Sequence, residues 1–343
     1  MINFGKNTPS NKKIALFTHT DMDGDGCSIL AKLAFGTSNV DVRYCGYNNV
    51  DEQVKNFLSL SKKYDHCFVT DISVSNHLAD IIDRGYYNFK LFDHHATEIE
   101  LNKYAWCDVV VENSNGVKTC GTELFYNWLL DNKYLDDLLE EQLRSAKEMV
   151  EMIRRYDTWD WASMGEEGLV SKKWNDLFGI YSHKQFVDRC VNQIQSGLSF
   201  SDFSQEDLLL LGVEQQRINS YIKQKDSCLV TATLCGHSCG IVFAERYMSE
   251  LGHKLCDLHP ELDFIVLINM NGRISYRSQK EDLDLGKKIA SVFGGGGHVG
   301  SAGSEFNKDN ITKMILNSLF KDKLTLCSDV PSQDVENEEF ELE

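Results

Sequence analysis

Histidine and aspartate residues gather at three places in the first hundred residues of the chain. Residues 19–26 read HTDMDGDG, Asp71 follows an apolar run, and residues 93–95 read DHH. Imidazole and carboxylate groups in combination are typical ligands of Mn, Fe, Co or Zn. Each group taken singly is equally compatible with a solvated loop. The prediction of a metal site therefore depends on whether the fold brings the three groups together.

The segments before these groups have the composition of buried strands. Residues 14–18 read IALFT, residues 66–70 read HCFVT and residues 89–92 read FKLF. Helical patterns separate them, and a further strand pattern covers residues 40–44. Alternating strands and helices predict an α/β fold with a parallel sheet, whose strands end at one shared edge where ligands bind. We expect groups that follow three such strands to meet at that edge.

The acidic stretch is the most unusual of the three groups. Asp21, Asp23 and Asp25 lie within five residues, and carboxylates this close repel one another unless a cation neutralises them. An Asp-rich helix N-cap would account for one carboxylate and hardly for three. A calcium loop of the EF-hand type would need a twelve-residue spacing and a terminal Glu, which this stretch lacks. The glycines predict an acidic loop here, followed by a helix over residues 27–35.

A second group of unusual residues lies towards the other end of the chain. Residues 294–297 are four glycines, and His298 follows them. A glycine run is entropically costly to order unless the backbone must approach another group closely, and its bare N–H groups could form an anion-binding nest. Arg277, near the end of a predicted strand, could supply a bidentate phosphate contact. A flexible linker and a surface charge are the alternatives for these two features. A helix predicted over residues 205–225 connects this part to the first.

Composition limits the classes of function. The chain has 343 residues, 42% of them hydrophobic, a net charge of −17 and 11 cysteines. This charge disfavours long nucleic acids, whose binding needs several Lys or Arg contacts, but allows a small anionic substrate held by metal ions. The polar first ten residues lack a secretory signal and no apolar run could span a membrane, so we expect a cytoplasmic protein with reduced thiols. Cys235 and Cys239 have no second pair of matching spacing, which disfavours a structural zinc site.

Taken together, the motifs resemble the DHH phosphoesterase superfamily over nearly the whole chain, residues 13–306. They occur in the expected order: His19-x3-Asp23-x-Asp25, Asp71, Asp93-His94-His95, Asp157 and Gly294–Gly303. The last motif resembles the signature of the accessory DHHA1 domain and argues against the inorganic pyrophosphatases of the superfamily. The chain is similar to the small two-domain members, which include oligoribonucleases, bacterial nanoRNases and pAp-phosphatases. The amino-acid sequence of residues 22–26 is closer to the RecJ-like form of the first motif.

The resemblance implies two divalent metal ions, with Mn²⁺ as the expected ion and Mg²⁺ or Co²⁺ as alternatives. The implied metal ligands are His19, Asp23, Asp25, Asp71, His94 and Asp157, with Asp71 bridging both ions. The alternatives to Asp157 are Asp108, Asp160 and Asp176. The implied catalytic residues are Asp71, Asp93, which orients a histidine, and His95, which contacts the scissile phosphate. The implied substrate contacts are His95, Arg277, Gly296, Gly297 and His298.

The implied activity is hydrolysis of short oligonucleotides or dinucleotides (nanoRNA and pApA type) to mononucleotides, by in-line attack of hydroxide at a two-metal centre. Two alternatives stay open: a RecJ-like exonuclease specific for single strands, and a non-catalytic nucleotide-binding regulator. The implied domains are an α/β DHH catalytic domain over 1–203, a connecting helix over 204–226, a smaller α/β DHHA1 domain over 227–325 and an acidic, disordered tail over 326–343. A short oligonucleotide or dinucleotide is the expected partner, long nucleic acids and membranes are not, and a homodimer stays open.

Overall fold

The computed structural model describes residues 12–86 and 88–320. The chain forms two units, the first ending at Glu214 and the second beginning at Gln215, and each has its own sheet and hydrophobic clusters. The domain limits, the homodimer and the cytoplasmic location expected from the sequence stay predictions, and the acidic tail expected over 326–343 lies outside the described residues. No helix in the two described stretches has both the length and the apolar composition that crossing a membrane requires.

The sheet of the first unit is parallel throughout, which confirms the fold class predicted from the alternation of strands and helices. Its strands are β1 Ile14–Thr18, β2 Val40–Tyr44, β3 His66–Thr70, β4 Phe89–Asp93 and β5 Cys107–Val109. Their order across the sheet is β2-β1-β3-β4-β5. Thr18 lies opposite Thr70, and Thr70 lies opposite Phe92, so the carboxyl ends of three neighbouring strands are level. The residues that follow these strands therefore start from one edge of the sheet.

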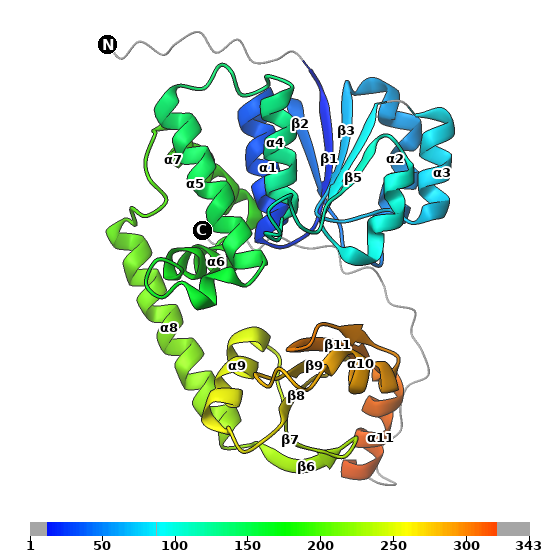
Figure 1. Ribbon diagram of the computed structural model, residues 1–343, viewed down its shortest axis with the longest axis vertical. Coiled ribbons are helices and arrows are strands. Elements are labelled where there is room, and N and C mark those ends of the chain that lie inside the picture. Colours follow the sequence, from blue (N-terminus) through cyan, green and yellow to red (C-terminus); the bar gives the residue numbers. More distant parts are fainter. Residues whose placement is uncertain (1–11, 87, 321–343) are drawn as a thin grey trace. The chain divides into compact units, whose positions relative to one another are not determined.

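Helices cover both faces of this sheet. The described α-helices that precede α8 in the chain are α1 Met22–Phe35, α2 Val50–Phe57, α3 Asn76–Gly85, α4 Gly121–Asp131, α5 Glu140–Asp157, α6 Leu169–Ile180 and α7 His183–Gln195. Short 3₁₀ helices are η1 Thr37–Asn39, η2 Leu58–Lys63, η3 Ala96–Lys103 and η4 Asp160–Ser163. Figure 1 shows α1 and α4 on one face of the sheet and α2 and α3 on the other. Phe68 of β3 packs in one hydrophobic cluster and its neighbour Val69 in the other, which explains why the strands are continuous apolar runs.

The helix after β1 begins earlier than the sequence suggests, so the acidic loop expected over residues 19–26 is confirmed only for residues 19–21 and is wrong for residues 22–26. α1 begins at Met22, because the Asp21 side chain caps it by accepting a hydrogen bond from the Gly24 N–H at 3.0 Å. Aspartates in the first turn are favourable beside the positive end of the helix dipole. Gly24 must lack a side chain, because a Cβ there would lie 2.1 Å from the His19 carbonyl oxygen. The helix therefore starts directly against the backbone that leaves β1.

The second unit is built on a mixed sheet. Its strands are β6 Val230–Leu234, β7 His237–Phe243, β8 Phe264–Asn269, β9 Arg273–Arg277, β10 Gly296–Gly297 and β11 Ser301–Glu305. Their order is β10-β11-β9-β8-β7-β6, with β7 and β8 parallel and the other neighbours antiparallel. The described helices of this part are α9 Met248–Leu258, α10 Leu285–Lys288, the 3₁₀ helix η5 Ala290–Phe293 and α11 Lys308–Phe320. The helix predicted over residues 205–225 is confirmed as α8 Gln205–Asp226, which continues from the first unit into the second.

Candidate metal centre

The three groups of histidines and aspartates meet at the carboxyl edge of the parallel sheet. His19 follows β1, Asp71 follows β3 and Asp93 ends β4, and these three strands are neighbours. The Asp71 N–H donates to the Phe92 carbonyl oxygen at 2.9 Å, which joins the turn after β3 to β4. The strand pattern of the sequence predicts this convergence, at the edge where open α/β sheets bind ligands.

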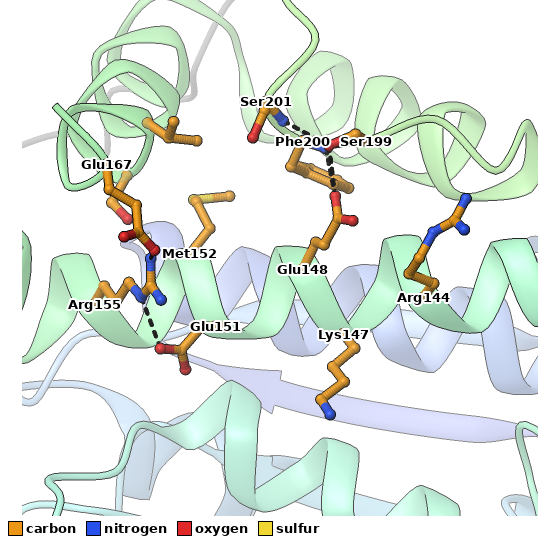
Figure 2. Close-up of a pocket in the computed structure, with 12 residues that line it drawn as sticks. Arg144, Lys147, Glu148, Glu151, Met152, Arg155, Glu167, Ser199, Phe200 and Ser201 are labelled. Atoms are coloured by element: carbon orange, nitrogen blue, oxygen red, sulfur yellow. Dashed lines mark hydrogen bonds and ion pairs between the residues drawn. The ribbon is translucent and has the colours of Figure 1, made fainter.

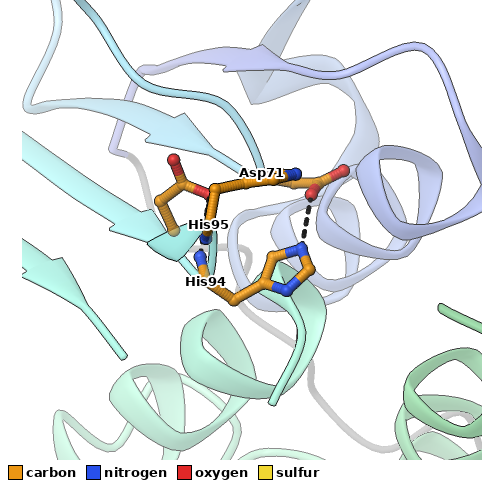
Figure 3. A group of neighbouring side chains, drawn as sticks. Asp71, His94 and His95 are labelled. Atoms are coloured by element: carbon orange, nitrogen blue, oxygen red, sulfur yellow. Dashed lines mark hydrogen bonds and ion pairs between the residues drawn. The ribbon is translucent and has the colours of Figure 1, made fainter. Parts of the chain in front are cut away.

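Potential ligand atoms form three overlapping groups, in each of which all atoms lie within 4.8 Å of one another. The groups are Asp71, Asp93, His94 and His95; His19, Asp21 and Asp71; and Asp23, His94 and Asp157. Asp71 and His94 each belong to two groups, so the three are linked into one centre. The His94 Nε2 lies 3.3 Å from Asp71 Oδ1 and 3.5 Å from Asp157 Oδ2. Figure 3 shows the His94 ring directed at the Asp71 carboxylate.

Asp21, and not Asp25, joins the centre from the acidic stretch. The Asp21 Oδ2 lies 2.7 Å from His19 Nδ1, whereas Asp25 is in none of the groups. The reason is the early start of α1: two residues advance a helix by about 200°, so Asp23 and Asp25 project from opposite sides. The assignment of Asp25 as a ligand assumes a loop, and it overlooks Asp21. The sequence signal for Asp21 is an aspartate that can cap a helix and that comes soon after the end of a strand.

Asp25 instead ties α1 to β2 and α7. Its Oδ1 accepts hydrogen bonds from the Tyr44 hydroxyl at 2.5 Å and from His183 Nδ1 at 3.0 Å, and the rings of these two partners stack with centroids 4.1 Å apart. Asp25 is fully buried, and its Oδ2 has no hydrogen-bond partner. Burial raises the pKa of Asp25, and the hydrogen bond to Asp25 raises the pKa of His183. The two side chains form a buried contact between an acid and a base.

Close packing holds two of the carboxylates of the centre. The Asp23 carboxylate accepts hydrogen bonds from the Gly121 N–H at 2.6 Å and the Thr122 N–H at 2.9 Å, which begin α4, and a helix N-terminus stabilises an anion in this position. Asp71 has a φ of 56°, in the left-handed region that non-glycine residues rarely adopt. A Cβ on Gly121 would lie 2.7 Å from the Asp71 Cβ and 3.0 Å from Asp23 Oδ2. Only glycine fits between these two carboxylates.

The centre carries more negative charge than its protein partners neutralise. Burial raises the pKa of Asp71 well above its usual range, and the charges of Asp21, Asp23 and Asp157 raise it further. Burial and neighbouring carboxylates also raise the pKa of Asp157 well above its usual range. The Asp71 Oδ2 and the His94 Nε2 are buried and have no hydrogen-bond partner. Divalent cations would neutralise the carboxylates and satisfy both unpaired atoms, so the residues present fit a metal centre.

Asp93 supports the two histidines that follow it. Its Oδ1 accepts hydrogen bonds from the His94 N–H at 2.7 Å and from His95 Nδ1 at 2.6 Å, and its Oδ2 accepts one from the Ser73 hydroxyl at 2.5 Å. Because protein donors occupy both oxygens, Asp93 acts on the centre through its neighbours. Burial by itself would lower the pKa of His95, but the hydrogen bond to Asp93 and the charges of nearby carboxylates raise it. The other ring nitrogen of His95, Nε2, lies 3.1 Å from the Tyr47 hydroxyl.

Asp157 is the aspartate that α5 brings to the centre. It is the last residue of that helix, and it shares a group with Asp23 and His94. Three alternatives belong to no such group in the described part of the chain: Asp108, Asp160 and Asp176. Asp160 forms an ion pair with Arg154 at 2.7 Å instead.

The glycine run of the second unit is part of a hairpin. Gly296–Gly297 forms β10, and the chain turns at His298, whose N–H donates to the Ser301 carbonyl oxygen at 2.7 Å. The N–H groups of Gly294 and Gly295 also donate to backbone carbonyls, at 3.2 Å and 2.9 Å. The interpretation of the glycine run as a nest of bare N–H groups is therefore wrong for Gly294 and Gly295.

Arg277 ends β9, at the same end of the second sheet. It lies opposite Ser301 of β11, and its Nη1 donates to the Tyr276 carbonyl oxygen at 2.9 Å. Its stem packs closely on Gly252, where a Cβ would lie 2.5 Å from the Arg277 Cγ. Burial lowers the pKa of Arg277, and no carboxylate of residues 12–86 or 88–320 forms an ion pair with it. A half-buried guanidinium with a neutral carbonyl partner retains N–H groups for an anion.

A cavity of about 390 Å³ lies in the helical part of the first unit and is lined mainly by residues of α5 and α6 (Figure 2). Three of its charged side chains pair with one another: Arg155 lies 2.7 Å from Glu151 and 2.7 Å from Glu167. None of the residues that line the cavity belongs to the ligand groups. The cavity is therefore separate from the metal centre.

Replacing Gly121 by alanine tests the packing between the carboxylates. We expect Gly121→Ala to bind Mn²⁺ about tenfold more weakly, because the added Cβ would displace Asp71 or Asp23. Isothermal titration calorimetry measures this affinity. Gly212→Ala is the matched control, because that glycine lies within α8 and a Cβ there meets nothing within 4 Å. Wild-type Mn²⁺ affinity in Gly121→Ala would contradict the packing argument.

The contact between Asp25 and His183 predicts coupled effects on stability. His183→Ala leaves a buried carboxylate without its base, so we expect the free energy of unfolding to fall by about 2 kcal/mol. The double variant Asp25→Val, His183→Ala should lose less free energy of unfolding than the two single variants lose in sum. Urea unfolding in EDTA measures the effect without a metal contribution. Lys184→Ala, which breaks an exposed ion pair with Asp188, is the control and should leave the free energy of unfolding nearly unchanged. Additive losses would rule out the coupling.

Known proteins resemble the chain in sequence and in structure. No family profile matches it. The chain is 32% identical over 315 residues to the oligoribonuclease NrnB of Bacillus subtilis (strain 168), and the match covers 89% of this chain and 76% of that relative. The match therefore extends over most of both proteins.

Two solved structures share the fold. The exonuclease RecJ bound to manganese matches with a TM-score of 0.51 and 12% identity, over 89% of this chain and 88% of that chain. RecJ from Thermus thermophilus in complex with Mn²⁺ matches with a TM-score of 0.54 and 11% identity, over 90% of this chain and 52% of that chain. At these identities the likeness concerns the fold. The sequence match to NrnB shows the family, and the protein belongs with NrnB to the DHH phosphoesterases.

Proposed function

We propose that the protein is a metal-dependent phosphodiesterase that hydrolyses short oligonucleotides or dinucleotides to mononucleotides. The observation that carries this proposal is the set of linked ligand groups at the sheet edge, two of which share Asp71. A carboxylate shared between neighbouring ligand sets suits two divalent ions acting on one phosphodiester. The relationship to the oligoribonuclease NrnB supports both the reaction and the short substrate.

Two sets of residues would hold the metal ions. The first set is the group of His19, Asp21 and Asp71. The second set would combine the group of Asp23, His94 and Asp157 with Asp71, whose Oδ1 lies 3.3 Å from His94 Nε2. Divalent ions bound there supply Lewis acidity, which lowers the pKa of water and stabilises charge on phosphate oxygens. We infer Mn²⁺ as the ion, because mixed imidazole and carboxylate ligands suit it and the RecJ structures of the same fold contain it.

The protein's own groups orient the phosphate. Asp93 holds the Nδ1–H of His95, so Nε2 is the nitrogen that a phosphate oxygen can reach. When the ring is protonated, Nε2 carries a hydrogen and can donate it to a phosphate oxygen. A donor fixed in this way stabilises negative charge that develops on the phosphate in the transition state.

Short substrates agree with the charge of the chain. A net charge of −17 would repel a long polyanion, whose binding depends on many Lys and Arg contacts. We assign four residues of the second unit to the terminal nucleotide or its phosphate: Arg277, Gly296, Gly297 and His298. The guanidinium of Arg277 supports this role, because Nη1 donates to a backbone carbonyl and the remaining N–H groups can bind a phosphate in a bidentate manner.

A chain-length series tests the proposed function. With Mn²⁺ we expect 5′-labelled RNA of two to about five nucleotides to be hydrolysed fastest and an RNA of about twenty nucleotides slowest, because repulsion grows with the number of phosphates. Asp71→Asn is the control: it keeps the side-chain volume, removes the shared charge and should show no detectable hydrolysis.

Two results would contradict the proposal. Preference for the twenty-nucleotide RNA would favour a RecJ-like exonuclease. Absence of hydrolysis at every length, with no binding of two Mn²⁺ ions in calorimetry, would favour a non-catalytic regulator.

Loss of the Arg277 guanidinium should affect binding more than chemistry. We expect Arg277→Ala to raise the KM for a dinucleotide about tenfold, because a hydrogen bond to a charged group is lost. Hydrolysis of bis-p-nitrophenyl phosphate, which lacks a nucleoside, should change less. Arg273→Ala, at the other end of β9, is the matched control. Equal losses on both substrates would argue against a substrate contact at Arg277.

A further inference from the structure

Tyr47 is an exposed aromatic residue beside the metal centre. It lies in the loop between β2 and α2, and 61% of its surface is exposed. Two hydrogen bonds shape this loop: the Cys45 N–H donates to the Thr18 carbonyl oxygen at 2.8 Å, and the Gly46 N–H donates to Asn49 Oδ1 at 2.9 Å. Because Thr18 ends β1, the loop is tied to the edge of the sheet that carries the centre.

Three contacts hold the Tyr47 ring against two histidines of the centre. Its centroid lies 4.9 Å from the centroid of His19, and 5.9 Å from that of His95 in an edge-on arrangement. Its hydroxyl lies 3.1 Å from His95 Nε2. Because His95 donates its Nδ1–H to Asp93, Nε2 is the ring nitrogen that faces the Tyr47 hydroxyl. The ring is held in one orientation and is still mostly exposed.

A fixed, exposed ring in this position suits a nucleobase. Single exposed aromatic residues are ordinary, but Tyr47 is oriented by contacts with His95, the residue assigned to the phosphate. Aromatic side chains stack on bases with little sequence preference, because every base has a π-face. We propose that Tyr47 stacks on the base of the nucleotide whose phosphate reaches His95. This base subsite rests on the proposed function and deepens it.

The hydroxyl and the ring of Tyr47 have separate roles in this subsite. In the free protein the hydroxyl occupies the Nε2 of His95, which is the position that a phosphate oxygen would take. The substrate phosphate therefore replaces the hydroxyl, and the ring supplies the contact to the base. A tyrosine that only held His95 in place would act through its hydroxyl, whereas a stacking tyrosine acts through its ring.

Two variants separate the ring from the hydroxyl. Tyr47→Phe keeps the ring, and Tyr47→Leu keeps an apolar side chain without a π-face. For a dinucleotide with Mn²⁺, we expect KM to rise about tenfold in Tyr47→Leu and by less than about twofold in Tyr47→Phe. We expect kcat to stay within about twofold of the wild type in both. Two dinucleotide analogues, each lacking one of the two bases, identify the stacked base. The analogue that lacks the stacked base should have the same KM in the wild type and in Tyr47→Leu, because the ring has no base to contact.

A binding measurement gives a readout without turnover. The probe is a dinucleotide that contains 2-aminopurine and has a methylene group in place of the bridging oxygen of its scissile phosphodiester. It is not hydrolysed, and its fluorescence falls when the 2-aminopurine base stacks. We expect the wild type and Tyr47→Phe to quench it and Tyr47→Leu to quench it far less. Circular dichroism checks that both variants are folded.

The outcomes distinguish this inference from the proposed function. If the wild type hydrolyses dinucleotides and Tyr47→Leu has an unchanged KM, the stacking role is overturned and the proposed function stands. An equal rise of KM in Tyr47→Phe would also overturn it, because the effect would then come from the hydroxyl. If the wild type hydrolyses nothing but quenching depends on the Tyr47 ring, the proposed function fails and the base subsite is supported.

Discussion

Repulsion among four carboxylates at one sheet edge is the constraint on which the first unit depends. Asp21 caps α1, Asp23 lies in its first turn, Asp71 follows β3 and Asp157 ends α5. Water cannot screen these charges well, and the pKa values of Asp71 and Asp157 are raised by burial and by their neighbours. The fold holds the charges together through strands and helices far apart in the sequence. Their remaining repulsion is what makes the site suitable for divalent cations.

The elements around the centre meet this constraint with specific contacts. The N-terminus of α4 donates two N–H groups to Asp23, and Gly121 leaves the space that Asp71 needs. Both carboxylate oxygens of Asp93 accept hydrogen bonds from protein groups, and two of these bonds orient His94 and His95. The supporting groups bond within the protein, whereas Asp71 Oδ2 and His94 Nε2 have no hydrogen bond and could bind a metal ion.

The carboxyl edge of the parallel sheet indicates how a strongly acidic protein can bind an anionic substrate. Cations bound at the centre would reverse the local charge, so a basic surface is unnecessary for a substrate with few phosphates. His95 lies between two partners with different tasks: Asp93 fixes its Nδ1, and Tyr47 lies against its Nε2. In our proposals the phosphate is recognised by the metal ions and His95, and the base by the exposed ring of Tyr47.

The sequence by itself determined the parallel α/β sheet and the convergence of the strand ends, because strands buried on both faces need continuous apolar runs and parallel strands end at one edge. It also predicted that Asp71 and His94, which follow two of these strands, would lie at that edge. Only the tertiary structure shows that Asp21, and not Asp25, lies among the grouped side chains, since the start of α1 depends on a cap and on glycine packing against the backbone after β1. Tyr47 has no sequence pattern that marks it. Its role follows from contacts between loops 48 residues apart, which no local spacing encodes.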